Sequence, residues 1–334
     1  MSKTIQRLFF ILMLLSVYIS AAMAEVAPPS CKDALTLDEA AAALKVPGAA
    51  APYVNFTGTP TDILPFNGPP FTQMNPIKLF DNFYFVGTTK VGAFVIDTGN
   101  ALVMIDTGIG EIDSGLMVAD MKKLGLDPAK IKLLLISHEH NDHYGGVQFL
   151  KKNVCPNAKV AMSLIGWNML QTTPLAWAFM NPRPQSVDIF LTDGMKLMVE
   201  NTTIQMVYTP GHSAGCMSFI IPVKDNGEAH VAGIMGGSGV WTVPLDARLY
   251  KASVEYFKSF ADAAKCDVGL GVHSQEEDFA ALRIRKQGEP HPLVLGTEKF
   301  DTVYLKKFRD MYQFVIESGK MASYPMALQR PKSF

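Results

Sequence analysis

Cysteine is scarce in this chain, and basic residues are not in excess over acidic ones. The 334 residues include 4 cysteines, 30 Lys and Arg together, and 31 Asp and Glu together, which gives a formal net charge of −1. The cysteines lie far apart with no C-x-x-C pair, which argues against a metal site built from closely spaced cysteines. The balanced charge argues against a nucleic-acid partner, because such proteins carry a surplus of Lys and Arg.

Charged residues make up only 18% of the chain, whereas hydrophobic residues make up 48%. This composition excludes disorder as the dominant state, because enough apolar surface can be buried to offset the entropy lost on folding. The length of the chain allows one large domain or two small ones.

The N-terminus contains an apolar run that no later segment matches in length. The run covers residues 8–19. Basic residues precede it and the small residues Ala22-Met23-Ala24 follow it, as in a secretory signal peptide. A membrane anchor is the alternative, but the run is too short to span a bilayer comfortably. We therefore predict a signal peptide over residues 1–24, export to the periplasm or the medium, and no membrane anchor once the signal peptide is removed.

Export would place the cysteines in an oxidising compartment. Cys31, Cys155, Cys216 and Cys266 allow three ways of forming two disulfides, and the sequence does not choose among them. A buried free thiol is the alternative for each. Cys216, at the start of a predicted strand, is interpreted as a core thiol and not as a metal ligand.

The rest of the chain divides into two regions. Residues 25–77 are rich in Pro, Ala and Gly and predict an extended N-terminal arm that wraps around the domain. Residues 78–330 alternate short apolar runs with amphipathic patterns, which predicts an α/β domain of layered sheets with outer helices. Strands are expected over residues 83–86, 92–96, 101–105, 131–136, 158–162, 189–191, 195–199, 203–208, 216–222 and 230–234.

Three longer helices are predicted from apolar residues at helical spacing, over residues 116–124, 246–264 and 302–318. In the second helix, the buried stripe is expected to be Leu249, Ala252, Tyr256 and Phe260. In the third helix, Asp301 is expected to cap the start and Gly319 the end. Residues 163–186 predict an irregular stretch, and its part from Trp167 to Met180 is expected to shape a pocket.

The chemistry of the chain is concentrated in one segment, directly after a predicted buried strand. The segment Ser137-His138-Glu139-His140-Asn141-Asp142-His143 holds three imidazoles and two carboxylates, where α/β folds place ligand sites. His138 and His140 are two residues apart and can point the same way in extended backbone. Asp142 and His143 fall on the turn into the next helix, so one segment can serve two metal ions.

Two more histidines follow other predicted strands. His212 comes after a Pro-Gly turn and can complete one metal site, and His273 follows another apolar run and can supply a further ligand. His230 and His291 have no such setting and are interpreted as ordinary polar or core residues. Imidazoles with one carboxylate suit zinc better than magnesium or calcium, which prefer oxygen ligands. Three protein ligands for each ion leave a position open for water, as in catalytic zinc sites.

The chain resembles the metallo-β-lactamase superfamily in four successive motifs, which are Ile105-Asp106-Thr107-Gly108, the segment just described, Thr209-Pro210-Gly211-His212, and His273. The resemblance runs from about residue 78 to about residue 285. It implies a four-layer αββα sandwich with the metal site at one edge of the two sheets, and residues 78–330 are thus interpreted as a metallo-β-lactamase-like hydrolase domain. Asp106 either supports a metal ligand or forms a turn.

Within the superfamily, the details resemble the third subclass of metallo-β-lactamases. Flavodiiron proteins have Glu where this chain has His140. Lactonases and glyoxalase II carry a metal-bridging Asp in the region that corresponds to residues 233–239, and this chain has no Asp there. The resemblance implies that one zinc ion is held by His138, His140 and His212, and the other by Asp142, His143 and His273. The chain departs from the subclass near residue 238, where Ser238 is the single candidate serine for a substrate contact.

The sequence therefore predicts an exported di-zinc hydrolase that opens β-lactam rings by attack of a zinc-bridging hydroxide, which Asp142 orients. A local charge of about +2 favours a small anionic substrate, and a role in antibiotic resistance would follow. A zinc hydrolase of the same fold acting on lactones, other cyclic amides or esters is the nearest alternative. A non-catalytic zinc-binding protein is another. The oligomeric state is left open by the sequence.

Overall fold

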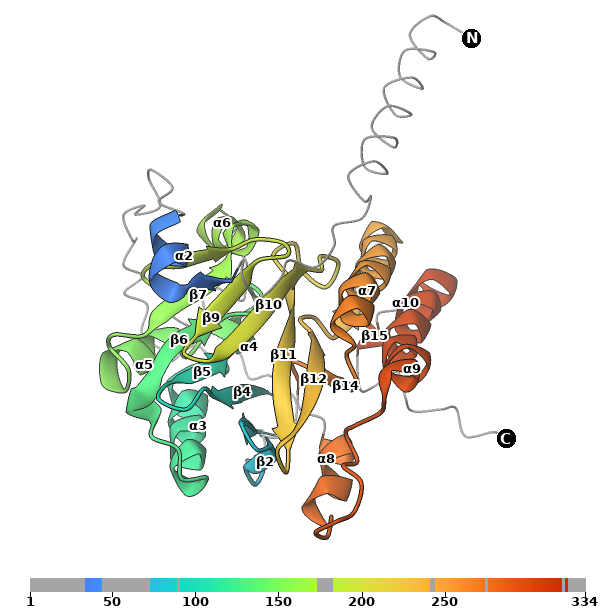
Figure 1. Cartoon of the computed structure of the whole chain (residues 1–334). Coiled ribbons are helices and arrows are strands. Elements are labelled where there is room, and N and C mark those ends of the chain that lie inside the picture. Colours follow the sequence, from blue (N-terminus) through green and yellow to red (C-terminus); the bar gives the residue numbers. More distant parts are fainter. Residues whose placement is uncertain are drawn as a thin grey trace, which may run out of the picture.

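The computed structural model describes residues 34–43, 73–88, 91–172, 183–240, 244–273, 276–319 and 322–323. The predicted signal peptide, most of the predicted N-terminal arm, Cys31 and residues 173–182 lie outside this described part. Within it, two β-sheets pack face to face and helices cover their outer faces (Figure 1). This arrangement confirms the predicted αββα fold class. Among the described helices, none combines the length and the apolar character needed to cross a bilayer.

The first sheet has seven strands in the order β2-β3-β4-β5-β6-β7-β8. Its strands are β2 (Ile77–Phe80), β3 (Phe83–Gly87), β4 (Gly92–Asp97), β5 (Leu102–Ile105), β6 (Ile131–Leu135), β7 (Lys159–Ser163) and β8 (Ile189–Leu191). Strands β2 to β5 pair antiparallel, whereas β5 to β8 are parallel. The parallel half brings the carboxyl ends of β5 and β6 to one edge, where the loops that follow them can carry a ligand site.

The second sheet has six strands in the order β1-β9-β10-β11-β12-β14. Its strands are β1 (Leu35–Thr36), β9 (Lys196–Val199), β10 (Thr202–Tyr208), β11 (Met217–Asp225), β12 (Glu228–Met235) and β14 (Val268–Gly271). A separate antiparallel pair consists of β13 (Gly239–Val240) and β15 (Ala322–Ser323). Strand β1 belongs to the predicted arm and pairs with β9, so this part of the arm extends the edge of the second sheet.

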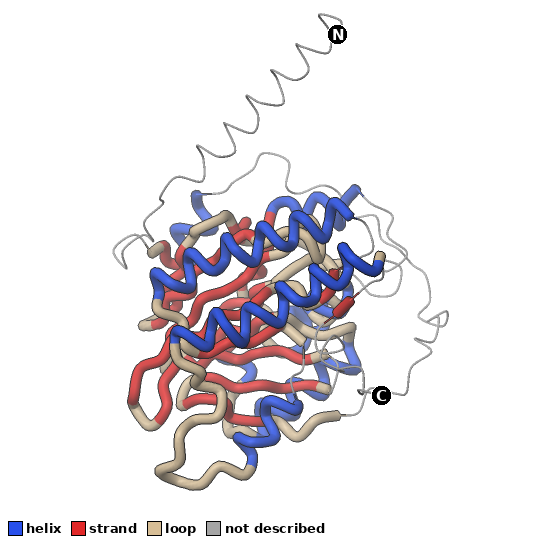
Figure 2. Tube along the Cα trace, turned by 90° about the vertical axis from the view of Figure 1, so that its right-hand side faces the viewer, coloured by secondary structure: helices blue, strands red, loops and turns tan. Residues whose placement is uncertain are grey.

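Helices enclose the two sheets. The outer helices are α3 (Glu111–Lys123), α5 (Val147–Asn153) and α6 (Leu164–Thr172) on the first sheet, and α7 (Pro244–Ala264), the π-helix η5 (Phe300–Leu305) and α10 (Lys306–Ser318) on the second. Figure 2 shows α7 and α10 lying side by side across the second sheet. The shorter helices are α2 (Leu37–Ala43), η3 (Pro128–Lys130), α4 (Asn141–Tyr144), α8 (Glu276–Arg283) and α9 (Thr297–Lys299).

Three apolar cores hold these layers together. The central core lies between the sheets and joins Phe85 and Phe94 of the first sheet to Phe219 and Ile234 of the second. The other two cores lie between each sheet and its outer helices. Burial of apolar surface on both faces of each sheet is the main driving force for this fold.

Each predicted strand is present, with its ends shifted by three residues at most. The predicted stripe of the helix over 246–264 is confirmed for Phe260, and Tyr256 is partly buried against the same core, whereas Leu249 and Ala252 are exposed. Leu249 is 42% exposed, and the residues of α7 that face the second sheet include Ala247, Tyr250 and Val254. The sequence offers two overlapping apolar series, and only packing against the sheet selects one.

Two further predictions are corrected by the structure. Asp301 does not cap α10, because η5 precedes that helix and Asp301 lies inside it, where it accepts a hydrogen bond from Arg309 at 2.6 Å. Gly319 ends α10 with a φ of 63°, as expected. Part of the stretch predicted to be irregular forms α6, and its Trp167 is buried in the core outside the first sheet. The pocket expected from the stretch Trp167 to Met180 stays a prediction, because residues 173–182 lie outside the described part.

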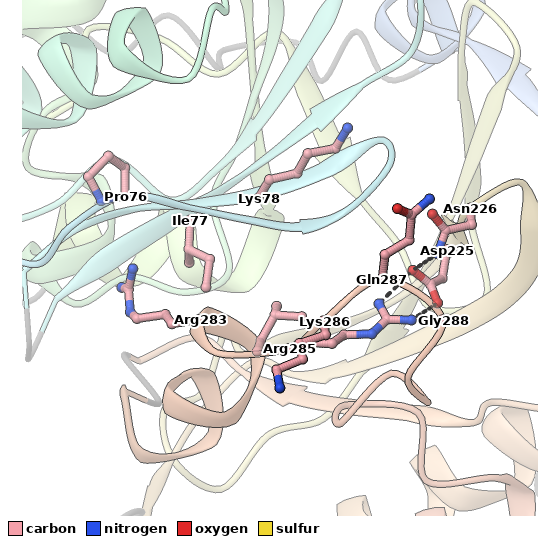
Figure 3. A pocket seen from close by; sticks show the side chains of 11 residues that line it. Pro76, Ile77, Lys78, Asp225, Asn226, Arg283, Arg285, Lys286, Gln287 and Gly288 are labelled. Carbon is pink, nitrogen blue, oxygen red and sulfur yellow. Dashed lines mark hydrogen bonds and ion pairs between the residues drawn. The ribbon is translucent and has the colours of Figure 1, made fainter.

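A surface pocket of about 540 Å³ lies beside β2 and the loop after α8 (Figure 3). Asp225 and Arg285 line it and form a two-bond ion pair, with distances of 2.7 and 2.8 Å. This pair ties the β11–β12 hairpin to the loop after α8. None of the predicted metal ligands lines the pocket, so it is separate from the site described next.

Candidate metal centre

The predicted metal-binding segment follows β6 at the edge where the two sheets meet. The amide of Met217 in the second sheet donates to the carbonyl of Ser137 at 2.9 Å. His140, with extended backbone angles of −76° and 147°, directly precedes α4. Alternation along this stretch places the side chains of His138 and His140 on one side and that of Glu139 on the other.

The first group consists of three imidazoles, those of His138, His140 and His212. Nε2 of His138 lies 3.1 Å from Nδ1 of His140 and 3.1 Å from Nε2 of His212. Tetrahedral ligands at ordinary zinc–nitrogen distances are about 3.3 Å apart. The three nitrogens therefore have the spacing of ligands to one small cation with a fourth position left for water or substrate.

The second group consists of Asp142, His143 and His273. Oδ2 of Asp142 lies 3.4 Å from Nε2 of His143 and 3.8 Å from Nε2 of His273. A backbone bridge to Val91 holds His273 beside the first sheet. The ring centroids of His138 and His143 are 3.9 Å apart, so the two groups are adjacent. The structure thus brings together all six residues that the sequence singled out.

Burial keeps the imidazoles of the first group neutral. It lowers the pKa of His140 to about 4 and, together with neighbouring imidazoles, lowers the pKa values of His138 and His212 well below their ordinary value. Neutral imidazole is the form that binds metal ions. The first group is therefore in the protonation state that a metal requires.

The second group fits a cation for a different reason. Burial disfavours a charge on His143, but the carboxylates of Asp142 and Asp106 outweigh burial and raise its pKa to about 10. Nε2 of His143 is buried and has no hydrogen-bond partner among the described residues. Two carboxylates lie close to the His143 ring and favour a positive charge there. A metal ion bound at Nε2 can supply that charge in place of the proton.

Asp106 supports the segment from behind. Its Oδ2 accepts from Nδ1 of His143 and from the hydroxyl of Ser137, both at 2.8 Å, and its Oδ1 accepts from the Ser137 amide at 2.8 Å. Fixing Nδ1 of His143 in this way turns its Nε2 toward Asp142. Asp106 has a φ of 63°, which Asp and Asn adopt more readily than most residues. Of the two alternatives for Asp106, the geometry supports the one in which it holds a candidate ligand.

His212 is positioned by the glycine-rich stretch that follows β12. Its Nδ1 donates to the carbonyl oxygen of Gly239 at 2.8 Å, which directs its Nε2 toward His138. A Cβ atom at Gly237 would lie 2.3 Å from Cβ of His212. Glycine is therefore required where this backbone passes the imidazole.

Gly237→Ala is expected to displace His212 and to weaken metal binding at the first group. Overpacking of this kind costs about 1–3 kcal/mol, so the melting temperature should fall by several degrees. Gly115→Ala is the matched control, because a Cβ in α3 would meet only Phe149, at 4.0 Å. This variant should keep native zinc affinity, and its melting temperature should not fall, because alanine favours a helix more than glycine does. Zinc titration and thermal unfolding measure the two effects, and native zinc affinity in the Gly237 variant would contradict the expectation.

Glu139 holds a role that the sequence did not suggest. Its carboxylate accepts from the hydroxyl of Ser213 at 3.0 Å and from the amide of Gly215 at 3.2 Å. The loop that carries His212 is thereby tied to the segment that carries His138. The alternation of the extended segment could have indicated that Glu139 faces away from the ligands, but not what it would bind.

The remaining predicted residues lie as follows. Ser238 is only 3% exposed, and its contact with substrate stays a prediction. His230 pairs with Asp267 at 2.6 Å and His291 contacts the carbonyl of Leu79 at 2.7 Å, which confirms both as ordinary polar or core residues. Buried free thiols are found at Cys155, Cys216 and Cys266.

Comparison with known proteins agrees with this geometry. Residues 86–225 match the family model of the metallo-beta-lactamase superfamily. The chain carries a metallo-β-lactamase superfamily domain. The matched stretch of this domain includes five of the six candidate ligands, and His273 follows it in the sequence.

Solved metallo-β-lactamases are similar to this chain over most of its length. A subclass B3 enzyme of Bradyrhizobium japonicum is 27% identical with a TM-score of 0.62, and the match covers 75% of this chain and 96% of that one. The native enzyme of Legionella gormanii is 25% identical with a TM-score of 0.63, covering 75% and 99% of the two chains. The resemblance to the third subclass, B3, is thus confirmed for the fold.

Curated relatives match shorter parts of this chain. A lactamase-like protein of Aspergillus niger is 30% identical over 128 residues, which are 38% of this chain and 34% of that protein. The atrochrysone carboxyl ACP thioesterase of Passalora fulva is 27% identical over 200 residues, or 57% and 49% of the two chains. The chain spans half or less of the length of these relatives.

Proposed function

We propose that this protein is an exported zinc hydrolase that opens β-lactam rings. The observation that carries the proposal is a three-histidine group beside an Asp-His-His group, at the edge of a sandwich that matches B3 enzymes over nearly their whole length. Nitrogen-rich ligand sets favour zinc, and two groups of three ligands suit two ions. The small-molecule substrate is proposed to be anionic, because a cationic site attracts it.

Zinc, when bound, would supply an activated water and polarise the carbonyl group of the substrate. The residues of the chain would bind the zinc ions and orient the reacting groups. Asp142 is 26% exposed on its side chain, so it faces both the site and solvent and can accept a hydrogen bond from the attacking water. Asp106 keeps Nε2 of His143 turned inward, and the carbonyl of Gly239 does the same for His212.

The proposal is tested with the purified, zinc-loaded protein and a chromogenic cephalosporin. Elemental analysis should give close to two zinc ions per chain, and turnover should disappear with a chelator and return with zinc. A ratio near one with full activity would rule out a two-ion site. If the protein binds two zinc ions but does not hydrolyse the cephalosporin, the proposed metal centre stands and the cephalosporin is excluded as its substrate.

Thioester hydrolysis is the second candidate function. It is favoured by the similarity to the fungal acyl carrier protein thioesterase, which covers 57% of this chain. The same site can serve both reactions, because each begins with attack of water on an activated carbonyl. A panel of cephalosporin, lactone and acyl thioester substrates, compared by kcat/KM on one protein preparation, separates the candidates.

Export makes a separate prediction. Cleavage after Ala24 should give a mature chain that begins at Glu25 and is recovered from the periplasm or the medium. N-terminal mass spectrometry of the natively expressed protein measures this directly. An intact Met1 on protein recovered only from inside the cell would show that residues 1–24 are not a cleaved signal peptide.

A further inference from the structure

The last described segment of the chain pairs with the backbone of the metal centre. After α10 ends at Gly319, strand β15 lies antiparallel to β13, with Ser323 opposite Gly239 and Ala322 opposite Val240. Figure 1 shows β15 beside α10. The carbonyl of Gly239 contacts His212. Strand β15 therefore pairs with the strand whose backbone positions a candidate ligand.

The direction of the backbone groups shows how this pairing acts. The amide nitrogen and the carbonyl oxygen of Gly239 lie 3.2 and 2.8 Å from Nδ1 of His212. In a strand, both groups of one residue point to the same side, and those of the next residue point to the other. Gly239 therefore faces His212, and Val240 faces β15. The alternation makes Val240 and Ala322 the hydrogen-bonded pair, and Gly239 and Ser323 the non-bonded pair.

A second anchor holds the same stretch from its other end. The hydroxyl of Tyr250 in α7 donates to the carbonyl of Gly237 at 2.7 Å. The stretch from Gly237 to Val240 is thus held by α7 before Gly239 and by β15 after it. With both anchors in place, the Gly239 carbonyl has a fixed position relative to His212.

We propose that β15 belongs to the metal centre and acts as a clamp on His212. By bonding to Val240, the backbone of Ala322 keeps the Gly239 carbonyl where it orients the imidazole, so Ala322 and Gly239 are positioning residues. This inference rests on the proposed zinc site. Partners that orient a metal ligand typically change metal affinity by about 10–100-fold when they are removed.

The test compares two proline substitutions in the full chain. Ala322→Pro removes the N–H that the ladder assigns to Val240. Ser323→Pro is the matched control, because its N–H points away from β13. Zinc binding is measured by competition with a chelator of known affinity, independently of catalysis. Ala322→Pro should weaken the binding of one of the two zinc ions about tenfold, whereas Ser323→Pro should keep native affinity for both.

Circular dichroism and thermal unfolding of the metal-free variants check the fold. Both should match the native chain, because β15 is a two-residue strand that follows the last helix and lies outside the two large sheets. Native zinc affinity in Ala322→Pro would overturn the inference, as would equal weakening in the two variants. A native chain that binds no zinc would instead overturn the proposed function, and the clamp with it.

Discussion

Asp142→Asn is expected to lower turnover at saturating substrate by about a hundredfold or more, which equals at least about 2.7 kcal/mol of transition-state stabilisation. The substitution keeps the size of the side chain but removes the one carboxylate among the six candidate ligands. Two functions are lost together, because Asp142 contributes negative charge to the second group and orients the attacking water. The variant should also bind the second zinc ion more weakly.

Steady-state kinetics and zinc titration measure these two losses separately. Asp310→Asn is the matched control, because Asp310 is 60% exposed on α10 and, within the described part of the chain, pairs with Lys306 of its own helix. An exposed pair of this kind contributes little to stability, so the control should keep native turnover and two zinc ions. Native turnover in the Asp142 variant, with both ions bound, would show that the mechanism does not use Asp142.

Asp106→Asn is expected to weaken zinc binding at the second group by about 10–100-fold, the range found for residues that orient metal ligands. The amide can still accept from the backbone of Ser137, but its NH2 group opposes the Nδ1–H of His143. The backbone should be undisturbed, because Asn tolerates the φ of 63° at this position. The metal-free Asn variant loses the buried pair with His143 but keeps the backbone unstrained, so its melting temperature should fall less than that of the Ala variant.

Asp106→Ala separates the charge from the backbone conformation. Alanine in the left-handed region costs about 1–2 kcal/mol, so this variant should lose both zinc affinity and thermal stability. Isothermal titration and thermal unfolding of the two variants give the comparison. Equal stability of the Ala and Asn variants would show that the positive φ at Asp106 stores no strain, and native zinc affinity in both would remove Asp106 from the support of His143.

The six candidate ligands could be found from the sequence because each stands directly after an apolar strand or its turn. Strand ends are local signals, and parallel neighbours bring them to one edge of a sheet. His138 and His140 also share an alternation that any extended chain obeys. The strands themselves were predictable for the same reason, because buried strands read as short apolar runs between turns.

Asp106 was a candidate support, but the partners of the residues that hold these ligands could not be found in the same way. Asp106 meets Ser137 and His143 across 31 and 37 residues, and Glu139 meets Gly215 across 76. Nothing in the spacing of such polar residues indicates which partner the fold will bring to them. The face that α7 buries was predicted only in part for a related reason. Two apolar series were available, and contact with β10 and β11 decided between them.

The position of β15 sets the order in which the protein can be completed. His138 and His212 are 74 residues apart, His273 is fixed by Val91, and the clamp comes from the end of the described chain. Contacts of such long range form late in folding, because the chain between them must first be ordered. The metal centre is thus finished only after the chain has been synthesised through Ser323. A chain exported before it folds would then take up its zinc outside the cytoplasm, from whatever supply that compartment holds.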